Sequence, residues 1–219
     1  MAKEKVAYVC SSCGYDSPKW IGKCPSCGEW NSFVEQKIGK GGASLSYGSS
    51  ASASSSPISM SRIVTEDDPR MNMYDNELNR VLGGGLVPGS LTLLGGEPGI
   101  GKSTLILQTV LRLKERKVLY VSGEESARQL KLRADRLCEQ VDGTIMEPLS
   151  DCQVVCEAML ETIFKHVESV QPDIVVIDSI QTVATETVES SPGSISQIRE
   201  CAAMVLKFAK ETNTPVILI

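Results

Sequence analysis

A glycine-rich stretch that ends in lysine and serine is the part of the sequence best suited to chemistry. Residues 96–103, GEPGIGKS, fit the phosphate-binding pattern G-x-x-x-x-G-K-[ST] without a mismatch. Glycines let the backbone curl until several N–H groups face one concavity, which makes a seat for anionic oxygens. A turn that needs glycine only for its bend is the alternative, but it leaves the offsets of Lys102 and Ser103 unexplained. The residues expected to bind a nucleotide are Gly96, Glu97, Pro98, Gly99, Ile100, Gly101, Lys102, Ser103 and Thr104.

Acidic residues after two apolar runs could complete this site. Asp178 closes the run DIVVID, and Glu124 comes shortly after the run KVLYVS. With ATP phosphates in the loop, Lys102 would reach the β- and γ-oxygens, while Ser103 and Asp178 would hold Mg²⁺. Hydrolysis also needs a carboxylate to orient the attacking water. We expect Glu124 in this role with Glu125 as its rival, because strand ends are uncertain by a residue or two. Two solvated acids at a helix start remain the alternative.

Four cysteines near the N-terminus form two C-x-x-C pairs with the spacing of metal ligands. Residues 14–23 separate the pairs, and a glycine that permits a positive φ follows each pair. Four thiolates in a tetrahedron are the ligand set of structural zinc and leave no position for a reacting water. A redox C-x-x-C would normally stand alone at a helix start, so the paired arrangement favours Zn²⁺. The expected zinc ligands are Cys10, Cys13, Cys24 and Cys27.

Other cysteines and aromatic residues have less specific roles. The cysteines outside the two pairs are expected to be small buried apolar residues; they are Cys138, Cys152, Cys156 and Cys201. The aromatic residues around the cysteine pairs could pack around the metal or stack on nucleic-acid bases, and packing is favoured for most of them. These aromatic residues are Tyr8, Trp20, Trp30 and Phe33.

Composition narrows the class of protein. The 219 residues are 42% apolar and 22% charged, with a formal net charge of −5. The chain as a whole is not positively charged, as a protein that binds nucleic acid over its whole surface would be. Any DNA contact therefore has to be made by a local basic patch, or by loops that oligomerisation brings together. No apolar stretch approaches the length of a membrane span, and the N-terminus has no apolar signal core. We therefore expect a cytoplasmic protein without a membrane partner, whose cysteines bind metal or stay reduced.

The elements that must position these residues alternate between strand and helix. This order predicts an α/β fold, a P-loop core with a mostly parallel sheet and helices on both faces, whose ligands lie at the carboxyl edge of the strands. Strands are expected at 91–94, 117–122, 143–147, 173–178 and 215–219. Helices are expected at 77–82, 104–113, 128–138, 152–170 and 197–210, and residues 182–196 are expected to form a mobile loop.

The chain divides into three parts by composition. Residues 1–38 are expected to form a small zinc finger, ordered by its metal because so short a segment buries little apolar surface. Residues 39–61 are a Ser/Gly/Ala tract with almost no charge and are expected to be a flexible linker. Residues 62–219 are expected to form the ATPase domain. The sequence stops within a strand pattern, so we expect this core to be incomplete at its C-terminus.

These features together resemble the RadA/Sms family of bacterial DNA-repair ATPases. The resemblance runs from the four-cysteine finger through NRVLGGGLVPGSLTLLGGEPGIGKSTLILQT, VLYVSGEES, IVVIDSIQTV and SSPGSISQIRE. The phosphate loop alone would indicate only a P-loop ATPase. The combination of the finger with LGGG, VPGS and SSPGSISQIRE is specific to the RadA/Sms family. Asn79 departs from the aspartate that the family usually has there. The family's second DNA loop, K-N-R-F-G stretch and Lon-like domain are absent from these 219 residues, so weak hydrolysis is expected.

The resemblance implies a RecA-like motor with Glu124 as catalytic glutamate and Asp178 as magnesium ligand. It further implies binding of single-stranded and branched DNA, a homo-hexameric ring and partnership with the recombinase RecA. Residues 182–196 take the place of the first DNA-facing loop, with Arg199 just beyond it. The strand at 215–219 should insert between the phosphate-loop strand and the Asp178 strand.

Two other functions fit the same residues. A KaiC-like ATPase that phosphorylates its own Ser or Thr is allowed by the hydroxyl-rich loop 182–196. A non-catalytic module that binds zinc and nucleotide and docks on another protein or on DNA is the third reading. Phosphate appearing on the protein would indicate the former, and tight ATP binding without turnover the latter.

Overall fold

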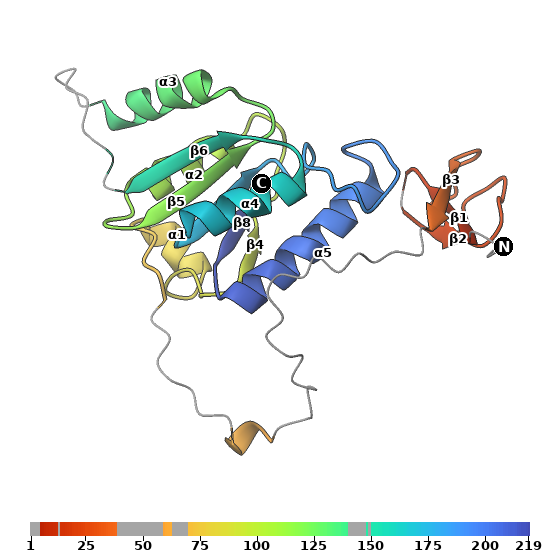
Figure 1. Ribbon diagram of the computed structural model, residues 1–219, viewed down its shortest axis with the longest axis horizontal. Coiled ribbons are helices and arrows are strands. Elements are labelled where there is room, and N and C mark those ends of the chain that lie inside the picture. The colour runs from red at the N-terminus through yellow and green to blue at the C-terminus, as the bar shows by residue number, and fades with distance from the viewer. Residues whose placement is uncertain (1–4, 13, 39–58, 63–69, 140–147, 149) are drawn as a thin grey trace.

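A small antiparallel sheet and a larger parallel sheet make up the protein (Figure 1). The structure, a computed structural model, describes residues 5–12, 14–38, 59–62, 70–139, 148 and 150–219. The small sheet has the order β2-β1-β3 and consists of β1 (Lys5–Cys10), β2 (Asp16–Ser17) and β3 (Phe33–Ile38). Both of its pairings are antiparallel. Cys10, one of the residues predicted to bind zinc, is the last residue of β1.

The large sheet is parallel throughout its described strands. Its order is β4-β8-β7-β5-β6, with β4 (Leu91–Leu93), β5 (Lys117–Ser122), β6 (Asp151–Cys156), β7 (Ile174–Asp178) and β8 (Val216–Leu218). The strand β8 lies between the phosphate-loop strand β4 and the Asp178 strand β7, as predicted. Ser122 at the end of β5 pairs with Asp178 at the end of β7. The residues after both strands therefore emerge side by side at one edge.

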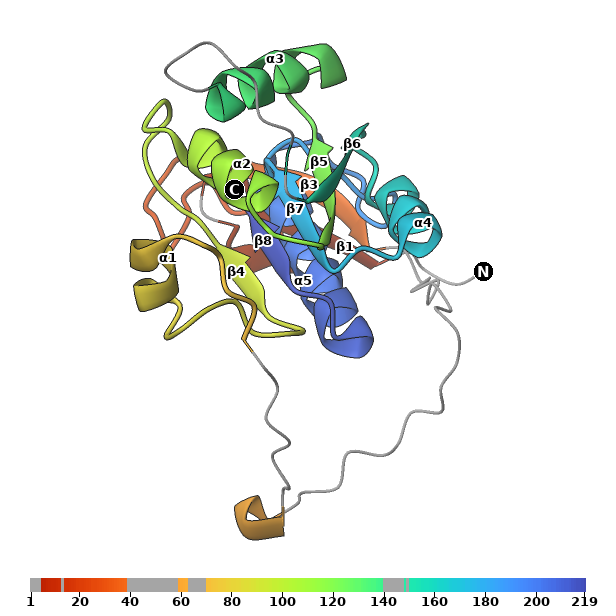
Figure 2. The ribbon, with the colours of Figure 1, turned by 90° about the vertical axis from the view of Figure 1, so that its left-hand side faces the viewer.

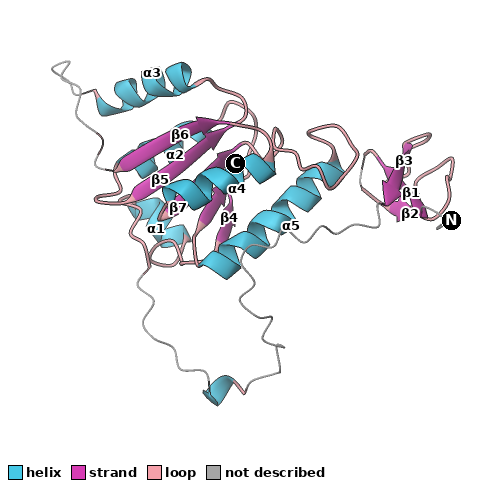
Figure 3. Ribbon diagram, in the orientation of Figure 1, coloured by secondary structure: helices cyan, strands magenta, loops and turns pink. Residues whose placement is uncertain are grey.

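Helices cover both faces of the large sheet (Figures 2 and 3). The helices are α1 (Asn76–Val81), α2 (Lys102–Leu111), α3 (Ala127–Cys138), α4 (Leu160–Val170) and α5 (Ile195–Thr212), preceded by the 3-10 turn η1 (Met60–Arg62). Apolar residues of α2 and α3 share one buried cluster, and those of α4 and α5 share another on the opposite face. This confirms the predicted α/β core. Among the described helices, none is both long and apolar enough to cross a membrane.

Strand alternation decides which face each side chain of the central strands meets. Val175 and Ile177 of β7 pack in the cluster of α4 and α5, whereas Ile174 and Val176 pack in that of α2 and α3. Because successive side chains point to opposite faces, Asp178 falls on the α2 face. The buried Tyr120 of β5 belongs to the same cluster as Ile174 and Val176. The helix that follows the phosphate loop therefore meets both Asp178 and Tyr120.

Several expected elements differ from the structure. The helix predicted over 152–170 is wrong in its first part, because Asp151–Cys156 is the edge strand β6 and the helix begins at Leu160. The helix after the phosphate loop begins at Lys102, two residues earlier than predicted, because Gly101 caps it. The strand expected at 143–147 and most of the linker at 39–61 lie outside the described residues. The three domain boundaries stay predictions.

Candidate nucleotide site and zinc centre

The phosphate loop leaves β4 and enters α2 through an exposed turn. Residues 95–101, which include the predicted Gly96, Glu97, Pro98 and Ile100, are exposed to solvent. Gly99 and Gly101 have φ values of 78° and 102°, which favour glycine, and Gly101 is the N-cap of α2. Lys102, Ser103 and Thr104 form the first turn of that helix. The positive end of the helix dipole and its free N–H groups thus lie at the turn, as an anion site requires.

Lys102 is already turned back over the loop. Its half-buried side chain donates through Nζ to the carbonyl oxygens of Gly96 and Glu97, each at 2.9 Å. An ammonium held by two neutral carbonyls can exchange them for phosphate oxygens, which carry full negative charge. The Lys102 ammonium therefore lies against the phosphate loop, where it can contact a bound phosphate.

Asp178 meets the start of α2 across the sheet edge. The Ser103 hydroxyl donates to Asp178 Oδ1 at 3.1 Å, although the two residues are 75 positions apart. A serine hydroxyl and a carboxylate are hard oxygen ligands of the kind Mg²⁺ takes in nucleotide sites. The described residues therefore fit a magnesium ion at this point, held by Ser103 and Asp178.

Tyr120 holds the second oxygen of the same carboxylate and was not foreseen from the sequence. Its buried hydroxyl donates to Asp178 Oδ2 at 2.6 Å. Burial, followed by the hydrogen bond to Asp178, raises the pKa of the Tyr120 phenol, so it stays protonated and keeps donating. A phenol within an otherwise apolar buried strand was the available signal, because buried tyrosine hydroxyls usually find a partner.

Glu124 and Glu125 have different partners. Glu124 is exposed, and its Oε1 accepts a hydrogen bond from Ser179 Oγ at 2.8 Å, directly after Asp178. Glu125 forms an ion pair with Arg133 of α3, and its backbone N–H donates to Ser122 Oγ at 3.0 Å. The structure therefore brings Glu124 beside the Asp178 strand and ties the Glu125 side chain to α3.

A close approach between two backbones keeps Glu124 near Ser179. The N–H of Gly123 donates to the carbonyl of Asp178 at 3.0 Å. A Cβ at position 123 would lie 1.9 Å from Thr182 Oγ1, which is inside van der Waals contact. Only glycine fits here without moving the segment that follows β7.

We expect Tyr120→Phe to weaken magnesium binding while leaving the fold intact. The substitution removes the hydrogen bond that orients Asp178, and loss of such an outer partner typically lowers metal affinity by about tenfold or more. Titration of Mg²⁺ at saturating ATP should show a half-maximal concentration raised by about that factor.

Tyr74→Phe is the matched control for this substitution, because Tyr74 is exposed and lies in the segment before α1. A Tyr120→Phe variant with reduced turnover but an unchanged Mg²⁺ dependence would contradict the role given to Tyr120.

Three of the four predicted zinc ligands converge beside the small sheet, with Cys10 at the end of β1 and Cys24 and Cys27 between β2 and β3. The sulfurs of Cys10, Cys24 and Cys27 all lie within 4.8 Å of one another, and those of Cys10 and Cys27 are 3.7 Å apart. Tetrahedral ligands on Zn–S bonds of about 2.3 Å stand about 3.8 Å apart, so the described sulfurs fit zinc. Cys13 lies outside the described residues.

The two cysteine turns repeat the same hydrogen bonds. The N–H of Gly14 donates to Cys10 O at 2.8 Å, and that of Gly28 donates to Cys24 O at 2.9 Å. These glycines have φ values of 72° and 77°, as their places after the pairs predicted. The buried Ser32 hydroxyl lies 3.1 Å from Cys10 Sγ and can donate to a thiolate there.

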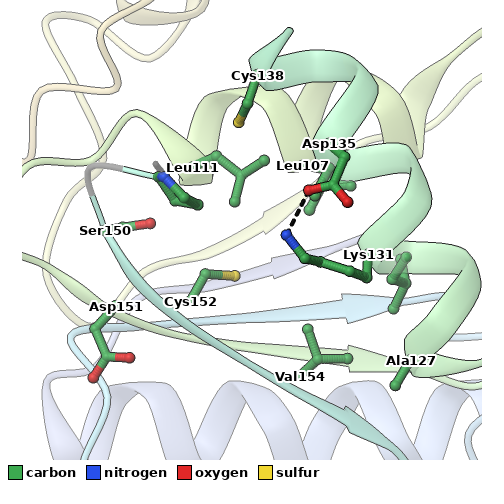
Figure 4. A pocket seen from close by; sticks show the side chains of 13 residues that line it. Leu107, Leu111, Ala127, Lys131, Asp135, Cys138, Ser150, Asp151, Cys152 and Val154 are labelled. Carbon is green, nitrogen blue, oxygen red and sulfur yellow. Dashed lines mark hydrogen bonds and ion pairs between the residues drawn. The ribbon is translucent and has the colours of Figure 1, made fainter. Parts of the chain in front are cut away.

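A cavity of about 390 Å³ lies apart from the phosphate loop, between α2, α3 and the edge strand β6 (Figure 4). Its rim carries an ion pair between Lys131 and Asp135 of α3. Burial raises the pKa of the Cys152 thiol to about 12, so this sulfur is not a thiolate at neutral pH. The expectation that Cys156 is buried is wrong, because this edge-strand residue is exposed. The cavity contains none of the residues predicted to bind ATP.

Two family models match this chain, and the larger of them defines the class of protein. A family model described as an AAA domain matches residues 61–219, so the chain belongs to that family. A second model, described as a rubredoxin metal binding domain, matches residues 8–35. A solved structure titled "Crystal structure of the RadB recombinase" aligns at 29% identity with a TM-score of 0.47, covering 68% of this chain and 69% of that chain.

Within that class, similar proteins include several named DNA repair protein RadA. The chain is 46% identical to the one from Bacillus subtilis over 223 residues and 47% identical to the one from Listeria monocytogenes over 221 residues. These alignments cover 100% of this chain and 47% and 46% of the relatives, so the chain spans about half of their length. The predicted resemblance to the RadA/Sms family is confirmed.

Proposed function

We propose that this chain is the ATP-binding part of a DNA-dependent ATPase that acts in recombinational repair on branched DNA intermediates. The observation that carries the proposal is the 3.1 Å contact between Ser103 at the end of the phosphate loop and Asp178 at the end of β7. Phosphate-binding and metal-binding groups from distant parts of the chain meet at one sheet edge, as nucleotide hydrolysis requires. The names of the relatives supply the repair context.

Each predicted site residue has a role that its position supports. The loop from Gly96 to Gly101 and the ammonium of Lys102 bind phosphate oxygens, and Thr104 adds to the first turn of α2. Ser103 and Asp178 hold Mg²⁺, which neutralises developing charge on the phosphates when bound. Glu124, which reaches the same edge through Ser179, orients and deprotonates the attacking water.

The partners follow from the family resemblance and from the local geometry. We propose that single-stranded DNA contacts the segment between β7 and α5, that the recombinase RecA is a partner, and that the chain works within a homo-hexamer. The start of α5 also contacts the zinc-binding sheet, because Arg199 Nη1 donates to Gly14 O at 3.0 Å. The proposed DNA segment and the zinc centre are thereby neighbours.

Phosphate release in the presence and absence of single-stranded DNA tests this function. We expect slow Mg²⁺-dependent hydrolysis of ATP by the chain that rises severalfold when single-stranded DNA is added, because DNA bound before α5 would contact the segment that begins at Ser179, whose hydroxyl hydrogen-bonds Glu124. An equal amount of duplex DNA is the control for nonspecific polyanion effects.

Three results would contradict the proposal. A rate of ATP hydrolysis that does not change when DNA is added would contradict the proposed DNA dependence. Radioactive phosphate transferred to the protein would favour the KaiC-like reading. Tight ATP binding without any turnover would leave a zinc- and nucleotide-binding module instead.

A further inference from the structure

The region of the cysteine turns exposes two large aromatic side chains to solvent. Trp20 and Trp30 are 51% and 67% exposed, whereas Phe33 beside the cysteines is 7% exposed. The packing role that the sequence favoured for the aromatic residues therefore fits Phe33 and does not fit either tryptophan. Exposed tryptophan is costly unless it meets a partner, which is why it is enriched at binding surfaces.

The two tryptophans lie together around Gly22. A Cβ at Gly22 would be 3.8 Å from the Trp20 ring and 3.9 Å from the Trp30 ring, so both rings border this residue. Trp30 is also held by an antiparallel bridge to Lys23, and the N–H of Asn31 donates to Gly22 O at 2.8 Å. The backbone thus holds Trp30 beside the second cysteine turn, and both rings border Gly22.

Positive charge accompanies these rings. Lys23 Nζ lies 5.5 Å from the centre of the Trp30 ring, and Lys19 is exposed next to Trp20. Residues 18–31 carry two lysines and one glutamate, while the whole chain has a net charge of −5. Two lysines therefore lie beside the two rings on a chain that is acidic as a whole. Stacking rings beside mobile cations match an unpaired base and its phosphate.

We propose that Trp20 and Trp30, with Lys19 and Lys23, form a base-stacking platform for single-stranded DNA. This inference depends on the proposed DNA binding and adds a second contact to it. The small domain that carries the platform also contacts the segment proposed to bind DNA, because Gly14 is buried against Ile195 at the start of α5. DNA bound before α5 therefore lies against the same domain as the two rings.

Intrinsic fluorescence provides a test that reports on this surface alone, because Trp20 and Trp30 are the two tryptophans of the chain. The full zinc-loaded chain is titrated with a thymidine oligonucleotide under tryptophan-selective excitation. The anisotropy of a labelled copy of the same oligonucleotide measures binding independently. We expect emission to be quenched in step with the rise in anisotropy.

Substitutions of Trp30 distinguish stacking of the ring on a base from nonspecific apolar contact with DNA. Trp30→Leu keeps an apolar side chain but removes the ring, and it should weaken oligonucleotide binding about tenfold, as loss of one stacked base does. Trp30→Phe keeps a ring and should restore most of the affinity. Val34→Ala removes an exposed apolar side chain elsewhere on the same sheet and should change nothing. Zinc content and circular dichroism verify that each variant is folded.

The possible failures can be told apart. If anisotropy shows binding while tryptophan emission is unchanged, the platform inference fails and the proposed DNA-dependent ATPase stands. If the oligonucleotide does not bind at all, both fail. If emission changes with protein concentration alone, and sedimentation shows a dimer, the rings meet a second copy of the chain and the inference is overturned.

Discussion

Replacement of Lys102 by alanine is expected to abolish measurable ATP hydrolysis, with a fall of at least about 10²–10³-fold in turnover. Lys102 is the cation at the first turn of α2, and its Nζ is held over the loop by the carbonyls of Gly96 and Glu97. Without this ammonium, only backbone N–H groups and the Mg²⁺ proposed at Ser103 and Asp178 are left to neutralise the charge on the transferred phosphate. Phosphate release and the binding of a fluorescent ATP analogue measure the two parts of the loss.

Lys114→Ala is the matched control, because Lys114 is exposed after the end of α2. It removes the same charge from the same part of the chain and should leave hydrolysis unchanged. Equal losses in the two variants would show that net charge matters and the position of Lys102 does not. An active Lys102→Ala variant would place the nucleotide elsewhere in the protein.

Much of the fold was predictable because its central strands are continuous apolar runs. Lys117–Ser122 and Ile174–Asp178 are buried on both faces between helices. Such strands appear in the sequence as continuous apolar runs, which can be recognised without knowing the tertiary contacts. The order of β4, β8 and β7 came instead from the family resemblance. The phosphate loop was readable because its glycines and lysine have a fixed spacing.

The edge strand β6 shows where the sequence misleads. It pairs on one side only, and four of its six residues are exposed, so it has no apolar run. Val155 and Met159 continue the four-residue spacing of the helix that follows, which made one long helix the simpler interpretation. Met159 in fact precedes the helix as its N-cap, in an extended conformation. Pairing with β5 outweighs the local pattern here.

The choice between Glu124 and Glu125 also lies beyond the sequence. Adjacent side chains at a strand end point in different directions. An error of one residue in the predicted end of β5 therefore assigns each glutamate the surroundings of the other. What distinguishes them is long-range: Ser179 approaches Glu124 from the end of β7, and Arg133 approaches Glu125 from α3. Neither partner can be assigned without the relative positions of three elements. The same is true of the Tyr120 hydroxyl on Asp178.

Glu124→Gln is expected to reduce ATP hydrolysis by about 10²–10⁴-fold while ATP still binds, because an amide cannot accept the proton of the attacking water. Glu125→Gln is its matched partner at the neighbouring position. It should keep hydrolysis within about threefold but lower the free energy of unfolding by about 1–2 kcal/mol, because Arg133 loses its charged partner in a part-buried site. Phosphate release, nucleotide binding and urea unfolding are measured on both variants.

The two variants separate catalysis from structure because their expected effects fall on different measurements. Ser179 Oγ can still donate to the side-chain oxygen of glutamine at position 124, so that variant should unfold like the unmodified chain. Loss of turnover in Glu125→Gln with full activity in Glu124→Gln would reverse the assignment. The ion pair with Arg133 would then have to open for catalysis, and the Arg133→Gln variant, which leaves Glu125 unpaired, would be more active than the unmodified chain.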